Sequence, residues 1–166
     1  MTAPCTEHEF IVSAQDYQIY LQDEKAETEF SETMHDELVQ DLFSIGDRIV
    51  AIGTVRPTEV QVVIECVEEE PEDEDLEDWD QVVECSLDVP SGTLVITNNI
   101  ESFDMAARVQ LNAPGVYRLR IFYGMLDEVD DEGFEGDDFY KVVLWPDSMQ
   151  EPKMLKKWFP SLNFEP

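Results

Sequence analysis

Carboxylates are the side chains with the most evident chemical potential in this sequence, and they concentrate in two short segments. Between residues 65 and 80 eleven of sixteen residues are acidic, and between residues 127 and 138 eight of twelve are. Each segment also holds one aromatic residue, Trp79 in the first and Phe134 in the second. Because both segments fall between predicted strands, we expect two acidic loops.

Carboxylates spaced along a loop can resemble a row of phosphates, so a basic groove that accepts nucleic acid would attract them. Trp79 and Phe134 would then supply the desolvated contacts that charge alone does not provide. The predicted partner is therefore a basic protein such as a nuclease or toxin. The predicted partner-binding residues are Glu68, Glu69, Glu70, Glu72, Asp73, Glu74, Asp75, Glu77, Asp78, Trp79, Asp80, Asp127, Glu128, Asp130, Asp131, Glu132, Phe134, Glu135, Asp137 and Asp138.

The acidic charge is also consistent with a role in solubility alone. An acidic run between strands is usually a solvated or disordered loop, and salt-adapted organisms make all their proteins acidic. Calcium binding is disfavoured, because with Gly133 as the turn glycine of an EF-hand loop the twelfth position falls on Phe139. We expect no dedicated metal site and no cofactor.

The sequence does not favour an enzyme. It contains no nucleophile-elbow, P-loop or dinucleotide-binding glycine pattern. His8 and His35 each stand alone, without the pairing of a zinc protease, so we expect surface or helix histidines. The many carboxylates do not indicate which two would perform acid–base chemistry.

The whole chain bounds these hypotheses. Its 166 residues, 43% of them hydrophobic, are enough for one domain with its own core. Its formal net charge of −29 would repel nucleic acid and anionic membrane. Residues 1–152 hold 38 acids and 7 bases, a net charge of −31, and form the predicted acidic domain, whereas 153–166 form a basic and aromatic tail. No apolar run reaches the roughly 18 residues of a membrane span, and no signal peptide is recognisable, so we expect a cytoplasmic protein.

The elements that must position the loops are mainly β. Period-two alternation predicts about eight strands, over 10–13, 17–21, 60–66, 83–89, 92–97, 107–111, 116–123 and 139–145. The first two are expected to form an edge hairpin, and a stripe of Met34, Leu38 and Leu42 predicts one short helix. Arg118 and Arg120 are expected on an exposed sheet face, paired with acids. The predicted fold is an antiparallel β-sandwich.

Cys5, Cys66 and Cys85 show neither a CxxC motif nor a dense even-numbered framework. Cys66 and Cys85 flank the first acidic segment on presumed strands and could face each other. In a reducing compartment we expect free thiols instead.

Three segments of the body, "SLDVPSG", "VQLNAPGVYRLRIFYG" and "DDFYKVVLWP", follow an early aromatic-rich strand pair and a short helical stretch. In this order the chain resembles the competence protein J family, bacterial inhibitors of the DNA-entry nuclease. The resemblance spans about Phe10 to Pro146 and implies a protein inhibitor that occupies a nuclease. The two acidic loops are heavier than the family leads us to expect, so an immunity protein against another basic toxin fits equally.

The leading hypothesis is an inhibitor or immunity protein that covers a basic active site or groove. The competing hypothesis is an acidic accessory or structural protein of phage or host, whose charge serves solubility or loose DNA mimicry.

Overall fold

Alternating apolar residues form the strands of two sheets in a computed structural model, which describes residues 6–26, 32–72, 76–98 and 106–159. The strands are β1 (Glu7–Ser13), β2 (Gln18–Asp23), β3 (Phe43–Gly46), β4 (Ile49–Gly53), β5 (Glu59–Cys66), β6 (Gln81–Val89), β7 (Thr93–Thr97), β8 (Ala107–Gln110), β9 (Gly115–Gly124), β10 (Phe139–Pro146) and β11 (Lys153–Lys156). The helices are α1 (Glu32–Asp41) and two short 3-10 turns, η1 (Gln15–Tyr17) and η2 (Leu76–Asp78).

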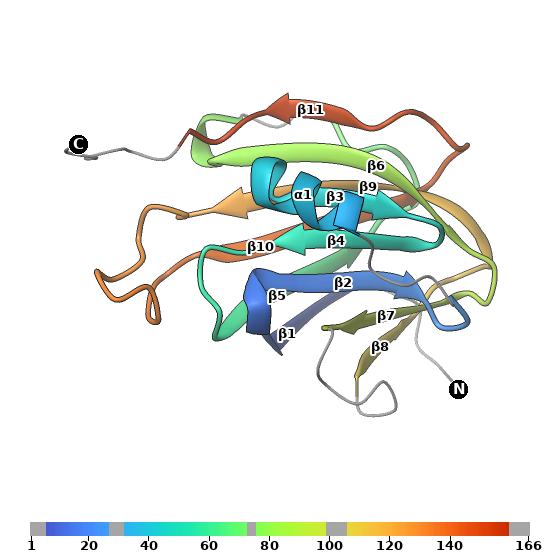
Figure 1. The fold of residues 1–166 in the computed structure, drawn as a ribbon. Helices are drawn as coiled ribbons and strands as arrows, with labels where there is room; N and C mark the ends of the chain where they lie inside the picture. The colour runs from blue at the N-terminus through green and yellow to red at the C-terminus, as the bar shows by residue number, and fades with distance from the viewer. Residues whose placement is uncertain (1–5, 27–31, 73–75, 99–105, 160–166) are drawn as a thin grey trace.

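The two sheets face each other as a sandwich (Figure 1). One has the strand order β1-β5-β10-β9-β6-β11 and the other the order β3-β4-β2-β7-β8. Neighbouring strands are antiparallel except β5 and β10, which run parallel. The predicted mainly β sandwich with one short helix is confirmed, and it contains more strands than expected because β3, β4 and β11 were not recognised.

The core between the sheets follows the predicted alternation. In β5 the side chains of Val60, Val62 and Ile64 are fully buried, while the residues between them are partly exposed. Strands β6, β9 and β10 add alternate residues to the same cluster, and β2, β4 and β7 close it from the opposite sheet.

The predicted hairpin of the first two strands is wrong. β1 pairs with β5 in one sheet, whereas β2 pairs with β4 and β7 in the other. The intervening η1 turn therefore carries the chain from one layer to the other. A turn between two apolar runs does not by itself distinguish this change of sheet from a hairpin.

Each sheet also has a covered outer face. Helix α1 lies on the five-stranded sheet, where Leu38 packs in a buried cluster with Tyr20, Ile49 and Ala51; the side chain of Met34 lies outside the described residues. On the six-stranded sheet, a second buried cluster is formed by Val82, Phe122, Val143 and Trp145.

Arg118 and Arg120 lie on that outer face of the six-stranded sheet, and the expectation that they are exposed is wrong. Their side chains are 1% and 7% exposed, and both pair with Glu84, with N–O distances of 3.2 and 2.8 Å. Arg120 also lies 5.2 Å from the centre of the Trp145 ring. The pairing with an acid was predicted correctly, but Gln150 and Glu151, later in the chain, accept hydrogen bonds from Arg118 and help to cover it.

The cysteines differ from one another. Cys85 is a free thiol, fully buried in the core, as expected. Cys66 is disulfide-bonded, so the expectation of a reduced thiol is wrong there. Cys5 lies outside the described residues.

Candidate protein-binding surface

The first acidic segment crosses the outer face of the six-stranded sheet. β5 and β6 are separated by β10 and β9 in the sheet, so residues 67–80, which we call the acidic crossover, connect two strands that are not neighbours. Its apolar residues Val67, Leu76 and Trp79 pack on the buried cluster of that face. With the apolar side chains turned inward, the acids are exposed, namely Glu68, Glu69, Glu70, Glu72, Glu77 and Asp78. Asp73, Glu74 and Asp75 lie outside the described residues.

Trp79 is a packed residue. Its ring centre lies 5.0 Å from that of Phe122 and 5.3 Å from that of Phe139. Gly124 permits this packing, because a Cβ atom there would lie 2.7 Å from the Phe139 ring and 3.1 Å from the Trp79 ring. Trp79 thus anchors the end of the acidic crossover to the sheet, and only part of its side chain is accessible.

Asp80 joins the two acidic segments. Its backbone N–H donates to the carbonyl of Tyr123 at 2.9 Å, and its carboxylate accepts from the N–H of Leu126 at 2.7 Å. The acidic crossover therefore ends where the second acidic segment begins.

The second acidic segment, residues 127–138, is a small hairpin, which we call the acidic hairpin. A β-bridge joins Val129 and Gly136, and the backbone N–H of Asp130 donates to the carbonyl of Glu135 at 2.7 Å. The Asp130 carboxylate accepts from the N–H groups of Phe134 and Glu135, at 2.9 and 3.2 Å. These backbone donors, chiefly that of Glu135, lower the pKa of Asp130.

Asp138 lies behind the acidic hairpin. It is 2% exposed and forms an ion pair with Arg56. It also accepts from the Tyr140 hydroxyl at 2.7 Å, and that hydroxyl accepts from the N–H of Val55 at 3.2 Å. Burial, followed by the nearby Asp138 charge, raises the pKa of Tyr140 well above its ordinary value. Asp138 thus fixes the base of the acidic hairpin.

The remaining predicted side chains of the acidic hairpin face solvent. The Phe134 side chain is 54% exposed. The exposed acids around it are Asp127, Glu128, Asp130, Asp131, Glu132, Glu135 and Asp137. The structure thus brings an accessible aromatic ring and a group of carboxylates together on one fixed loop.

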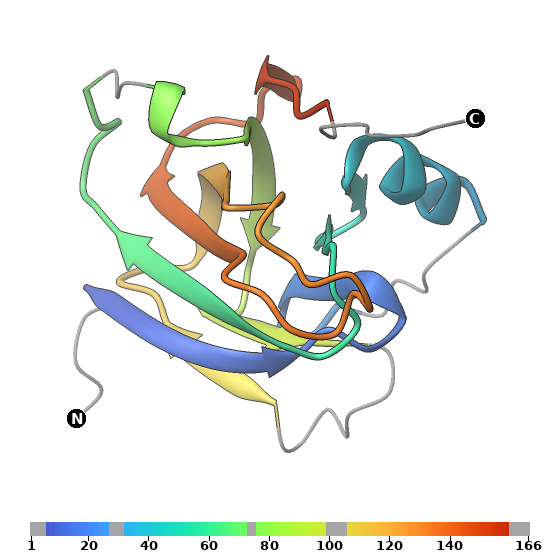
Figure 2. The ribbon, with the colours of Figure 1, turned by 90° about the vertical axis from the view of Figure 1, so that its left-hand side faces the viewer.

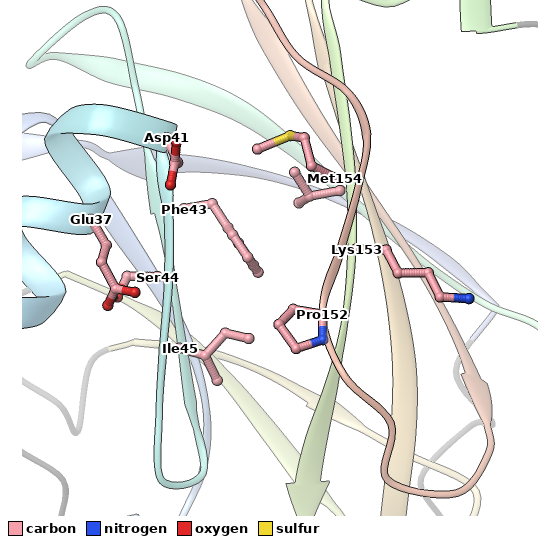
Figure 3. Close-up of a pocket in the computed structure, with 9 residues that line it drawn as sticks. Glu37, Asp41, Phe43, Ser44, Ile45, Pro152, Lys153 and Met154 are labelled. Atoms are coloured by element: carbon pink, nitrogen blue, oxygen red, sulfur yellow. The ribbon is translucent and has the colours of Figure 1, made fainter.

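A cavity of about 340 Å³ opens between α1 and β3 on one side and β11 on the other (Figure 3). Phe43, Ile45 and Met154 give it apolar walls, whereas Lys153 points away from it. Its two carboxylates are already engaged: Glu37 accepts from the Ser44 hydroxyl at 2.9 Å, and Asp41 pairs with Lys157 at 3.0 Å. This arrangement does not resemble a pair of catalytic carboxylates in unequal environments.

Two further findings concern the described residues. Among them, no group of three or more His, Cys, Asp or Glu side chains is arranged to hold a metal ion. In the same part of the chain, no helix has the length and apolar character needed to cross a membrane.

The ion pair by which Arg56 holds the base of the acidic hairpin was not recognised from the sequence. The sequence nevertheless indicates that Asp138 is buried. It continues the alternation of the inward-facing residues Tyr140, Val142 and Leu144, so its side chain is expected to point toward the interior. A buried carboxylate requires a cation or hydrogen-bond donors.

Comparisons with protein-family models and with curated protein sequences gave no match. Two solved structures have a similar fold. One is ComJ from Bacillus subtilis, an inhibitor of the DNA-degrading activity of NucA, with a TM-score of 0.58 and 15% sequence identity over 87% of this chain and 98% of ComJ. The other is the product of crocagin biosynthetic gene J, with a TM-score of 0.56 and 17% identity over 89% of this chain and 100% of that protein. The predicted resemblance to the competence protein J family is thereby confirmed as a likeness of fold.

Proposed function

We propose that this protein is a non-enzymatic inhibitor or immunity protein that binds and blocks a basic partner, such as a nuclease or toxin, through the acidic crossover and the acidic hairpin. The observation that carries the proposal is the fixed display of carboxylates around the accessible ring of Phe134. The fold shared with ComJ, which inhibits a nuclease, supports the same role.

The charge distribution explains how such an inhibitor would act. Exposed carboxylates draw a basic surface in by long-range attraction, which raises the association rate. Contacts of a desolvated aromatic ring then lengthen the lifetime of the complex. Because the acidic hairpin is fixed by Asp130 and Asp138, little conformational entropy is lost when it binds.

Capture of a partner at low salt, followed by affinity measurement over a salt series and a nucleic-acid degradation assay, tests the proposal. The informative variant combines Glu128→Gln, Asp131→Asn and Glu135→Gln, which remove three exposed charges from the acidic hairpin. We expect its affinity at low salt to fall about tenfold and its salt dependence to become shallower.

A matched control removes three exposed charges elsewhere, through Glu7→Gln, Glu9→Gln and Asp36→Asn in β1 and α1. Unchanged affinity in the hairpin variant, or an equal loss in the control, would overturn the proposed surface. Uniform micromolar binding to unrelated basic proteins such as lysozyme and cytochrome c would instead favour the acidic accessory protein.

A further inference from the structure

A second exposed aromatic residue lies in a turn whose backbone is linked to the acidic hairpin through one short segment. Tyr17, in the η1 turn, is 51% exposed, and Phe134 is 54% exposed. The segment of residues 54–58 lies between them: the N–H of Thr54 donates to the carbonyl of Tyr17 at 3.0 Å, and the hydroxyl of Thr58 donates to the carbonyl of Phe134 at 2.8 Å. Figures 1 and 2 show the blue η1 turn and the orange loop that contains the hairpin at the same end of the sandwich, and in Figure 1 the loop between β4 and β5 runs between them.

Segment 54–58 fixes the two aromatic residues relative to one another. The N–H of Ala14 donates to the carbonyl of Thr58 at 2.8 Å, which ties the segment to the start of the η1 turn. Arg56 forms its ion pair with the buried Asp138, which ties the same segment to the base of the acidic hairpin. The backbones of both aromatic residues are therefore held relative to one another before any partner arrives.

The charges around Tyr17 and Phe134 indicate which kind of partner would bind there. Asp131, Glu132 and Glu135 are exposed on the hairpin, so a second copy of this chain would bring like charges together. Among cations, the planar guanidinium of arginine stacks on aromatic faces and binds carboxylates through a two-pronged hydrogen bond, whereas the lysine ammonium is a compact, strongly hydrated charge.

The protein already contains such an arrangement in its interior. The guanidinium of Arg120 lies 5.2 Å from the centre of the Trp145 ring while its Nε donates to Glu84 at 2.8 Å. One arginine side chain thus contacts both an aromatic ring and a carboxylate.

Resting on the proposed function, we propose that Tyr17 and Phe134, together with the carboxylates of the acidic hairpin, form an arginine-selective contact surface. Its occupant is a basic protein surface that presents arginine side chains. Charge attracts any cationic protein, and the two rings select arginine over lysine.

Hexa-arginine and hexa-lysine peptides, which carry equal charge, probe this selectivity when their affinities are measured over a series of salt concentrations. The wild-type protein is expected to bind hexa-arginine about fivefold more tightly than hexa-lysine. The variant Tyr17→Leu with Phe134→Leu keeps apolar side chains but removes both aromatic faces. It should bind hexa-lysine as the wild type does and lose the preference for hexa-arginine.

Phe159→Leu is the matched control, because Phe159 is 75% exposed in the C-terminal part of the chain. It should keep the wild-type preference. Equal affinity of the wild type for the two peptides, or a preference that survives in the double variant, would overturn this inference and leave the electrostatic proposal standing. Failure of both peptides to bind at low salt would overturn this inference and the proposed function together.

Discussion

Glu84→Gln tests the buried charge cluster on the outer face of the six-stranded sheet. The carboxylate of Glu84 pairs with both Arg118 and Arg120, and the three side chains are 8%, 1% and 7% exposed. Glutamine keeps the shape but removes the charge, which leaves two buried guanidinium groups without their shared counter-ion. Loss of one partner from a buried ion pair costs roughly 3–5 kcal/mol.

The lower end of that range applies here, because Arg118 keeps its hydrogen bonds to the carbonyls of Gln150 and Glu151, at 3.3 and 2.9 Å. We therefore expect a loss of about 3 kcal/mol in the free energy of unfolding. For a domain of this size the melting temperature should fall by roughly 6–12 °C. Urea unfolding followed by circular dichroism and by tryptophan fluorescence measures the change.

Glu128→Gln is the control, because Glu128 is an exposed acid on the acidic hairpin. Since the protein carries a net charge of −29, removal of one exposed carboxylate relieves repulsion and should leave stability unchanged or slightly higher. The two substitutions remove the same charge and are expected to act in opposite directions. Equal stability of the two variants would refute the structural role given to Glu84.

Three further predictions concern packing, ionisation and charge. Gly124→Ala places a Cβ atom against the rings of Phe139 and Trp79, so it should lower the free energy of unfolding by about 1–3 kcal/mol and change the tryptophan emission. If the variant is as stable as the wild type, the rings are not packed against Gly124. Burial raises the pKa of Cys85 from 9.0 to about 12, so the native thiol should resist alkylation at pH 9, and rapid labelling would contradict its burial. The thiol ionises at a lower pH in the unfolded protein than in the native one, so the free energy of unfolding should decline as pH rises from 9 toward 12. This decline should be less steep in Cys85→Ala. Raising NaCl from about 10 to about 500 mM should increase the melting temperature by screening repulsion among acids, and a decrease would indicate that attractive ion pairs dominate.

Much of the fold could be predicted from residue alternation alone. The apolar residues of β5 and β9 recur at every second position, so their inward faces could be assigned without a structure. Strand β4 was not recognised because Ile49–Gly53 is buried on both faces, by the core and by α1, and therefore shows no alternation. The burial of Arg118 could not be predicted, because the residues that cover it belong to later segments of the chain.

The candidate surface could be predicted only in part. The acids and Phe134 were recognised from the local sequence, because a run of acidic residues with one aromatic residue among them can be identified regardless of conformation. Tyr17 was not recognised, because its proximity to the acidic hairpin depends on hydrogen bonds from Thr54 and Thr58, far along the chain. The predicted binding role of Trp79 stays a prediction, and the structure adds a packing role beside Phe122.

The parallel pairing of β5 with β10 affects how the chain acquires its structure during synthesis. β5 leaves the ribosome well before β10, yet in the finished sheet it lies between β1 and β10. β6 likewise requires β9, which is translated later. Contacts between such distant segments form slowly, so nascent chains truncated before β10 should remain sensitive to protease. Protection should arise in a single late step, once residue 146 has left the ribosome.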